Sequence, residues 1–340
     1  MRPQPEKEEN MESSRVVYLN GEFVPETQAK ISIYDSALMF GDMVFEMTRS
    51  FNKKQFKLRE HIERLYASMK YVHITPPMSM EDMEAACYAT IEKNDPLFKA
   101  TDEHRLMINV SRGPLSIYRE IFDNKMRPTV VIADFPLKWT VASMGPLFDT
   151  GINAVVPSQR AIPAYLLDPK VKSRSRLHYM MANIEVSQVP GDNNWALLLD
   201  PDGFVAEGTG DNFFIVKNNT ILTPEPRNIL KGISRAYIFE LAKKLDIPCI
   251  ETNIDMYETA NADEAFMTGT PFCLLPVTGL NSAPIGDGKR GKITQQLLTA
   301  WSESVGLDVE KQIKEYSAEV KSLGGGGATP YRFQSSSNNK

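Results

Sequence analysis

The sequence predicts an α/β (α+β) fold with a small α/β domain followed by a larger barrel-like domain. Residues 15–135 alternate strand-like runs with amphipathic helices, whereas residues 152–305 contain many short strands separated by turn residues. A chain of 340 residues has room for two domains, and 42% hydrophobic side chains are enough for two sizeable cores. We therefore expect two domains with a connecting segment.

The small domain is predicted to begin after a charged start, residues 1–14, which we expect to be a flexible tail. Hydrophobic spacing predicts strands at Leu106–Val110 and Val130–Ala133. Helical spacing of apolar residues predicts amphipathic helices around residues 60–72 and 80–93. The mixture of the two patterns gives the α/β assignment.

Glycine and proline breakers in residues 136–151 predict a linker between the domains. The large domain, residues 152–322, is expected to begin with a strand at Asn153–Val156. An amphipathic pattern from Val309 to Leu323 predicts a last helix. Four consecutive glycines and an end rich in serine and asparagine predict a second flexible tail, residues 323–340.

The composition is that of an ordinary soluble enzyme. A net charge of −5 gives no reason to expect a nucleic-acid partner, and no run of about 18 apolar residues predicts a membrane span. The first residues are too charged for a signal peptide. Cys87, Cys249 and Cys273 are odd in number and widely spaced, which predicts free thiols in a reducing cytoplasm. With the four histidines they form no spacing typical of a metal site, so we expect no metal.

A lysine and a carboxylate, Lys172 and Glu207, are suited to hold one cofactor. A lysine amine condenses with an aldehyde cofactor only when it is deprotonated, and a carboxylate can keep a pyridine nitrogen protonated. The pair predicts a pyridoxal-phosphate enzyme. Gly208-Thr-Gly210 alternatively matches part of the glycine motif of a Rossmann dinucleotide-binding fold. Phe213 stands where the third glycine of that motif belongs, so we do not favour a Rossmann fold.

A third segment, Leu230–Leu245, predicts a phosphate site. Gly232 and Ser234 stand where a tight turn and an N-cap belong, and the apolar residues that follow have helical spacing. A glycine turn that opens a helix presents free backbone N–H groups and the positive end of the helix dipole, which suit a phosphate. Taken alone, the segment could also be an ordinary capped surface helix.

With Lys172, Glu207 and the Gly232 turn in this order, the chain resembles the class IV aminotransferases, the fold-type IV pyridoxal-phosphate enzymes. The family includes branched-chain and D-amino acid aminotransferases, (R)-amine transaminases and aminodeoxychorismate lyase. The resemblance runs from about Val17 to Trp301. It implies pyridoxal 5'-phosphate as cofactor and at least a homodimer, in which a loop of one subunit, here the segment around Tyr118, completes the pocket of its neighbour.

Three further motifs support the resemblance. They are Asn20-Gly21 with the segment Phe40-Gly-Asp-Met-Val-Phe45-Glu46, then His61-Ile-Glu-Arg64-Leu65, and finally the run from Ala262 to Phe272. In this family the arginine of the second motif grips the cofactor phosphate, and its planar fork suits that role. The resemblance also implies that Gly269 and Thr270 close over the phosphate while Gly232, Ile233 and Ser234 surround it.

By resemblance, Lys172 is the catalytic Schiff-base lysine and Glu207 pairs with the pyridine nitrogen. Lys170 would lie on the same face of an extended segment. We favour Lys172 because the family places its lysine just before a helix, and residues 174–186 have the pattern of that helix. As the group that moves the substrate proton, Lys172 needs a pKa well below that of a free lysine, which burial beside a cation would provide.

The substrate residues mix features of several family members. The resemblance places Phe40, Phe45 and Thr270 beside the substrate, together with Arg105, which matches the arginine that holds the distal carboxylate of glutamate in branched-chain enzymes. Arg119 is a candidate carboxylate ligand, as is Arg112, although Arg119 could equally be a solvated loop residue.

Three positions depart from the family pattern. Glu103 stands where branched-chain enzymes have a tyrosine, two residues before Arg105. Pro271 replaces the usual alanine and has no N–H to donate to a substrate carboxylate. Leu177 stands at the offset of a tyrosine that usually contacts the cofactor, and Tyr179 follows two residues later. We therefore expect carboxylate binding to be rebuilt in this chain.

The predicted reaction is a ping-pong transamination from a hydrophobic, branched-chain-like amino acid to a 2-oxo acid such as 2-oxoglutarate. A D-amino acid or (R)-amine donor is the alternative, because the hand of the substrate depends on pocket electrostatics. A lyase of the aminodeoxychorismate type is less favoured, since Arg105 and the Thr-Gly-Thr turn are typical of the aminotransferases. A non-enzymatic relic is disfavoured because Lys172 and Glu207 are both present.

Overall fold

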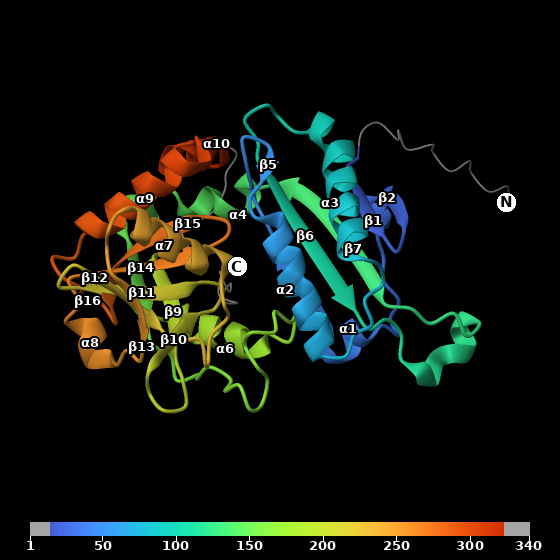
Figure 1. Ribbon diagram of the computed structural model, residues 1–340, viewed down its shortest axis with the longest axis horizontal. Helices are drawn as coiled ribbons and strands as arrows, with labels where there is room; N and C mark the ends of the chain where they lie inside the picture. Colours follow the sequence, from blue (N-terminus) through green and yellow to red (C-terminus); the bar gives the residue numbers. More distant parts are fainter. Residues whose placement is uncertain (1–13, 323–340) are drawn as a thin grey trace, which may run out of the picture.

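The computed structural model of the protein describes residues 14–322, in which two large sheets are surrounded by helices (Figure 1). This mixed architecture confirms the predicted α/β class. The two predicted tails lie outside the described residues, apart from Ser14. None of the helices in residues 14–322 is long and apolar enough to cross a membrane.

The first sheet has five strands in the order β2-β1-β7-β6-β3. Its strands are β1 (Val16–Leu19), β2 (Glu22–Pro25), β3 (Met43–Met47), β6 (His104–Ser111) and β7 (Thr129–Pro136). Helices α2 (Leu58–Tyr71) and α3 (Met80–Asn94) pack against it (Figure 1). The predicted strands and both predicted helices of this region are confirmed.

Side-chain alternation in β6 gives this sheet two different faces. Leu106, Ile108 and Val110 are fully buried in the core formed with α2 and α3. The alternate residues of the strand, which include Arg105 and Asn109, therefore face away from these helices. This second face forms one wall of the cavity described below.

A two-residue turn at Asn20-Gly21 joins β1 to β2 in a hairpin. Asn20 has φ 54° and Gly21 has φ 104°, and Leu19 pairs with Glu22 across the turn. Two consecutive residues with positive φ are typical of Asn-Gly hairpin turns, whose twist matches that of the strands.

The second sheet contains a closed ring of six strands, β10-β9-β8-β15-β14-β11, which confirms the barrel-like domain. The ring consists of β8 (Ile152–Val155), β9 (Asn194–Leu199), β10 (Val205–Gly208), β11 (Asn212–Lys217), β14 (Glu264–Gly269) and β15 (Cys273–Leu280). The pairing of Glu207 with Asn212 closes it. Strands β12 (Thr220–Pro224), β13 (Cys249–Thr252) and β16 (Ala283–Pro284) extend the sheet beyond the ring.

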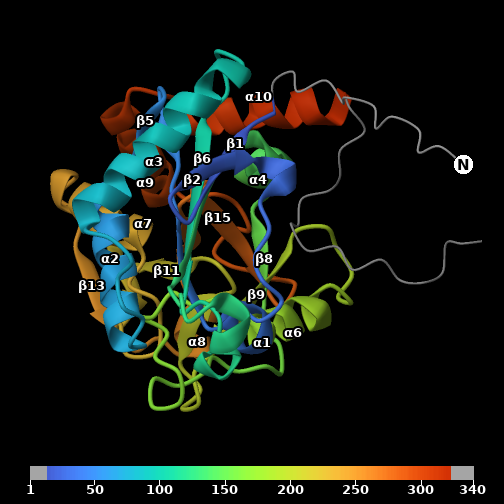
Figure 2. The same cartoon turned by 90° about the vertical axis from the view of Figure 1, so that its right-hand side faces the viewer.

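Helices cover the outside of the barrel, where they appear in green, orange and red (Figure 1). They are α6 (Leu177–Val186), α7 (Ile233–Lys244), α8 (Met256–Ala260), α9 (Lys292–Val305) and α10 (Val309–Ser322). The last helix confirms the predicted one as far as Ser322. Figure 2, turned by 90°, shows α2 near α7, and Lys57 at the start of α2 forms an ion pair of 2.9 Å with Glu240 of α7.

The segment predicted as a linker, residues 136–151, folds into three short helices. Leu137, Val141 and Phe148 are fully buried in it, and Ser317 of α10 donates a hydrogen bond to the carbonyl of Ala142. The segment therefore packs against the last helix. The domain boundaries at residues 15–135 and 152–322 stay a prediction.

The remaining elements of the described chain are short. They are η1 (Glu26–Gln28), α1 (Ser36–Phe40), β4 (Ser50–Phe51), β5 (Lys54–Gln55), η2 (Asp95–Leu97), η3 (Ser116–Phe122), α4 (Lys138–Val141), η4 (Ala142–Met144) and α5 (Leu147–Thr150).

Candidate active site

The segment that carries Lys172 lies against β3, the edge strand of the first sheet. The backbone N–H of Phe45 donates to the carbonyl of Lys172 at 2.9 Å, and Ser173 forms a bridge with Val44. An edge strand has free backbone groups that can hold such a segment. The helix predicted over residues 174–186 begins at Leu177, three residues later than expected.

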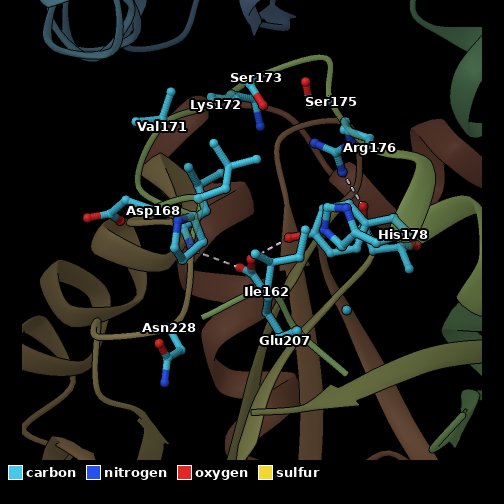
Figure 3. Close-up of a pocket in the computed structure, with 18 of the residues that line it drawn as sticks. Ile162, Asp168, Val171, Lys172, Ser173, Ser175, Arg176, His178, Glu207 and Asn228 are labelled. Atoms are coloured by element: carbon cyan, nitrogen blue, oxygen red, sulfur yellow. Dashed lines mark hydrogen bonds between the residues drawn. The ribbon is translucent and has the colours of Figure 1, made fainter. Parts of the chain in front are cut away.

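The two candidate lysines differ in their surroundings. Burial, followed by repulsion from Arg64, lowers the pKa of Lys172 to about 7. Lys170 instead forms an ion pair of 2.9 Å with Asp168, and its side chain is 37% exposed. Of the two, only Lys172 lines the pocket in Figure 3. Its amine can lose its proton near neutral pH.

Glu207 lies on the opposite side of this pocket from Lys172 (Figure 3). Its Oε1 accepts a hydrogen bond from the Tyr179 hydroxyl at 3.0 Å. Its Oε2 accepts from Asn212 Nδ2 and from the Leu230 N–H, both at 3.0 Å. Burial raises the pKa of Glu207 to about 7, although the hydrogen bonds from Leu230 and Tyr179 act to lower it. A carboxylate has about four acceptor positions, so one position remains for a further donor.

The glycine turn before α7 is tightly packed against this carboxylate site. Gly232, rather than Ser234, is the N-cap of α7, and a Cβ atom on Gly232 would lie 2.1 Å from Asn212 Oδ1. A side chain at this position would therefore displace Asn212. Ile233 and Ser234 begin the helix, so their N–H groups have no acceptor within it. Arg64 donates to the carbonyl of Lys231 at 2.8 Å, which places its guanidinium at this turn.

Arg64 also belongs to a buried ion cluster that explains the H-x-x-R spacing. It donates to Glu46 through Nε at 2.6 Å and Nη2 at 2.7 Å, while His61 Nδ1 lies 2.7 Å from the same carboxylate. Burial alone would raise the pKa of Glu46, but Arg64 and His61 hold it well below its usual range. Residues three apart on α2 thus reach one acid of β3.

A cavity of about 280 Å³ adjoins Lys172 and contains four of the predicted substrate residues. These are Phe45, Arg105, Thr270 and Pro271. The other lining residues come from the first sheet, the segment 136–151, the Lys172 segment with α6, and the barrel. They are Met47, Thr140, Met144, Lys172, Arg174, Arg176, Asn183, Asn194, Trp195, Ala196, Thr209, Gly210, Asp211 and Phe272. Lys172, Arg176 and Asp211 also line the pocket of Glu207, so the two spaces meet at the lysine.

Two predicted substrate residues lie elsewhere. Phe40 ends α1 and is 66% exposed, and Arg119 is an exposed residue of η3. Neither lines the two spaces described above. Their roles stay predictions.

The Thr268–Pro271 turn is fixed from two sides. Gly269 ends β14, and a Cβ atom there would lie 2.7 Å from the ring of Phe272. Arg49, which is fully buried, donates to the carbonyl of Pro271 at 2.9 Å and to Gln312 of α10 at 2.8 Å. The Thr268 hydroxyl at the same turn is buried and has no hydrogen-bond partner among residues 14–322. Arg49 therefore connects the last helix to the cavity wall.

Sequence reasoning missed several polar residues of the site. Tyr179 reaches Glu207, whereas Leu177, which occupies the usual tyrosine offset, is 74% exposed. Arg174 and Arg176 line the cavity, and their positions two and four residues after the lysine were the available signal. Asp211 lines it as well, and burial raises its pKa to about 8. Among residues 14–322, no three His, Cys, Asp or Glu side chains converge as a metal site.

Comparisons with known proteins agree with this geometry. Residues 43–280 match the family model described as amino-transferase class IV. A putative branched-chain-amino-acid aminotransferase of Methanocaldococcus jannaschii is 37% identical over 286 residues, 83% of this chain and 93% of that protein.

Two solved structures extend the comparison. The branched-chain amino acid aminotransferase of Escherichia coli superposes with a TM-score of 0.75 at 27% identity, over 86% of this chain and 94% of that one. The T.th. branched-chain amino acid aminotransferase, complexed with N-(5'-phosphopyridoxyl)-L-glutamate, gives a TM-score of 0.74 at 27% identity, over 90% of this chain and 97% of that one.

Fold and site together define an enzyme that transfers amino groups. The chain belongs to the class IV aminotransferase family.

Proposed function

We propose that this aminotransferase moves an amino group from a hydrophobic, branched-chain-like amino acid to a 2-oxo acid such as 2-oxoglutarate. One observation carries the proposal. The cavity beside Lys172 combines apolar walls from Phe45, Met144 and Trp195 with the buried Arg105, which has no acid partner among residues 14–322. Two successive substrates, one apolar and one a dicarboxylate, need both kinds of contact in one cavity.

The described residues fit pyridoxal phosphate as the cofactor. The free acceptor position on Glu207 suits a protonated ring nitrogen, and the N–H groups of Ile233 and Ser234 beside Arg64 suit a phosphate. A Cβ atom at Gly232 would collide with Asn212, so the turn is closely packed. Thr270 and Gly269 are placed on the phosphate by family resemblance. In the solved structure of the T.th. enzyme, a phosphopyridoxyl group is present.

Each site residue then has a chemical task. The bound cofactor supplies an electron sink for negative charge that develops at the substrate Cα. Lys172 Nζ would remove the proton from the substrate Cα and later return a proton, which its pKa of about 7 permits. Glu207 would hold the proton on the ring nitrogen of the cofactor, while Tyr179 and Asn212 fix the orientation of Glu207.

Substrate contacts divide by chemistry. Phe45, Met47 and Trp195 would contact the apolar side chain of the donor, since their own apolar side chains line the cavity. Arg105 would bind the distal carboxylate of the acceptor, because its planar fork can make paired charge-assisted bonds. The same cavity thereby accepts both partners in turn.

We further propose that the active form is at least a homodimer. Large apolar side chains are exposed around α1, η3 and α6, which is typical of an interaction surface. They include Ile33, Leu38, Phe40, Ile117, Ile121, Leu177 and Met181. In a dimer, Phe40, Arg119 and the segment around Tyr118 would be available to the neighbouring pocket. The cytoplasmic location stays a prediction.

The test is a set of half-reactions followed by stopped-flow absorbance of the cofactor. Holoenzyme mixed separately with L-leucine, D-alanine and (R)-1-phenylethylamine should convert rapidly with L-leucine. Lys172→Ala should lose on the order of 10²- to 10⁴-fold or more in rate. The matched control Lys170→Ala removes a nearby, ion-paired lysine and should convert normally.

The other outcomes are equally informative. Conversion by D-alanine or the amine instead would replace the branched-chain proposal with the alternative donors. No conversion by any of the three would favour a lyase. A fully active Lys172→Ala would refute the assignment of the catalytic lysine.

A further inference from the structure

Arg174 occupies the cavity wall two residues after Lys172 and is held in one orientation. Its guanidinium carbon lies 3.7 Å from the centre of the Phe45 ring, and its Nε donates to Asn109 Oδ1 at 2.9 Å. Phe45 and Asn109 are directly paired across β3 and β6. They form a two-residue platform on the cavity face of the first sheet. Stacking and one hydrogen bond thus fix the guanidinium plane and leave its two Nη groups without a partner in the described chain.

The charge around Arg174 is not balanced by the protein. Neither Arg174 nor Arg105 has an ion pair with a carboxylate of residues 14–322. The charged groups that act on Arg105 are Arg49 and Arg174, both positive, and with burial they lower its pKa to about 9. Asp211 is the acid in the cavity, and burial favours its neutral form. Because unpaired buried charge is costly, the cavity is built to receive anionic groups.

A second observation indicates which anionic group. Pro271 lines the same cavity and has no N–H, so this turn lacks one backbone donor for the α-carboxylate of a substrate. Its carbonyl is already bonded to Arg49. A carboxylate bound beside this turn therefore needs a donor from another element, and Arg174 has two Nη groups in the same cavity that are unpartnered among residues 14–322.

We propose that Arg174 binds the α-carboxylate of the substrate in place of the missing backbone donor, while Arg105 binds the distal carboxylate of a dicarboxylic partner. This assignment rests on the proposed function, since it presumes amino acid and 2-oxo acid substrates. Arg174 contacts every such substrate, whereas Arg105 distinguishes dicarboxylates from monocarboxylates. An amine donor without a carboxylate gains nothing from Arg174.

The test is a calorimetric titration of holoenzyme with two probes of one shape, 4-methylpentanoate and 4-methylpentanamide. Arg174→Gln should raise the Kd of the carboxylate on the order of 30-fold, as expected for loss of hydrogen bonds to a charged group, and leave that of the amide unchanged. Arg174→Lys keeps the charge without the planar fork and should fall between. The matched control Arg59→Gln removes a surface arginine of α2 that pairs with Glu81, and should behave as wild type.

Two outcomes of this titration would overturn the assignment. Equal weakening of both probes by Arg174→Gln would mean a packing role, and no weakening would mean no contact. Should Arg174→Gln fail to fold, Arg174→Lys gives the same comparison of carboxylate with amide. Arg105→Gln should raise the Kd of glutarate more than the Kd of 4-methylpentanoate. The reverse result would mean that the roles assigned to Arg105 and Arg174 must be exchanged.

Failure of the proposed function is seen separately. The wild-type half-reaction with L-leucine tests the donor, and its failure leaves the titration readable. An unchanged carboxylate preference in Arg174→Gln, with L-leucine still converted by wild type, would refute the role of Arg174 alone.

Discussion

Gly232→Ala should destabilise the protein through one side chain, Asn212. The new Cβ would lie 2.1 Å from Asn212 Oδ1, against 3.3 Å from the nearest other atoms, so Asn212 has to move. Asn212 donates to Glu207 and to the carbonyl of Leu230, both at 3.0 Å. Moving it therefore breaks two buried hydrogen bonds and loosens the carboxylate of the site.

The magnitude follows from those two bonds. A hydrogen bond to a charged group contributes about 2 kcal/mol and one to a carbonyl about 1 kcal/mol, so we expect a loss of about 3 kcal/mol in the free energy of unfolding. Gly210→Ala is the matched control, because its Cβ would meet no atom within 4 Å and its φ is not positive. That variant should stay within about 0.5 kcal/mol of wild type.

Urea unfolding of a double-mutant cycle is the assay. With Asn212→Ala already present there is no atom to displace, so Gly232→Ala should then cost less than about 1 kcal/mol, as expected for an N-cap change. The coupling between the two positions would be about 2 kcal/mol. A Gly232→Ala variant as stable as wild type, or a cycle in which the two costs simply add, would refute this account of the glycine.

Three further outcomes are expected. Because burial and Arg64 lower the pKa of Lys172 to about 7, the rate at which apoprotein attaches pyridoxal phosphate should rise about tenfold per pH unit up to that value and then level off; stopped-flow rates still rising at pH 9 would contradict it. Glu46→Gln leaves Arg64 without its buried anion and should cost about 3–5 kcal/mol in urea unfolding, whereas a loss below 1 kcal/mol would show that the ion cluster is dispensable. Burial acts to lower the pKa of His104, but its hydrogen bonds to Asp134 and Asp95 raise the pKa overall. The stabilisation from protonated His104 is therefore complete below the unfolded pKa of 6.5 and is lost as pH rises through the folded pKa. The free energy of unfolding of His104→Phe should differ from that of wild type more at pH 6 than at pH 9, and a pH-independent difference would contradict the coupling.

Local patterns predicted much of this fold. The helices α2 and α3 and strands β6 and β7 were predictable because each has an uninterrupted hydrophobic period. The Asn-Gly hairpin was predictable because few residue pairs tolerate two positive φ values. The Lys172 and Glu207 pair was predictable from the chemistry of its side chains and from family resemblance.

Other features depend on contacts that local patterns do not encode. The segment 136–151 has breakers typical of a linker, yet its apolar side chains are buried against α10, far along the chain. Tyr179 reaches Glu207 because the helix starts at Leu177, and helix starts are uncertain by several residues. Arg174 gains its orientation from Phe45 and Asn109, which belong to the first sheet and lie far from Arg174 in the sequence.

The pairing of Glu207 with Asn212 gives the barrel an unusual dependence on its ligand. These residues close the ring of strands, and Glu207 is also the proposed partner of the cofactor nitrogen. Local opening between β10 and β11 would therefore release the cofactor, and a bound cofactor would restrain that opening. Amide hydrogens of the two strands should exchange more slowly in the cofactor-bound enzyme than in the apoprotein. Cofactor binding and local opening between β10 and β11 would then be coupled in one equilibrium.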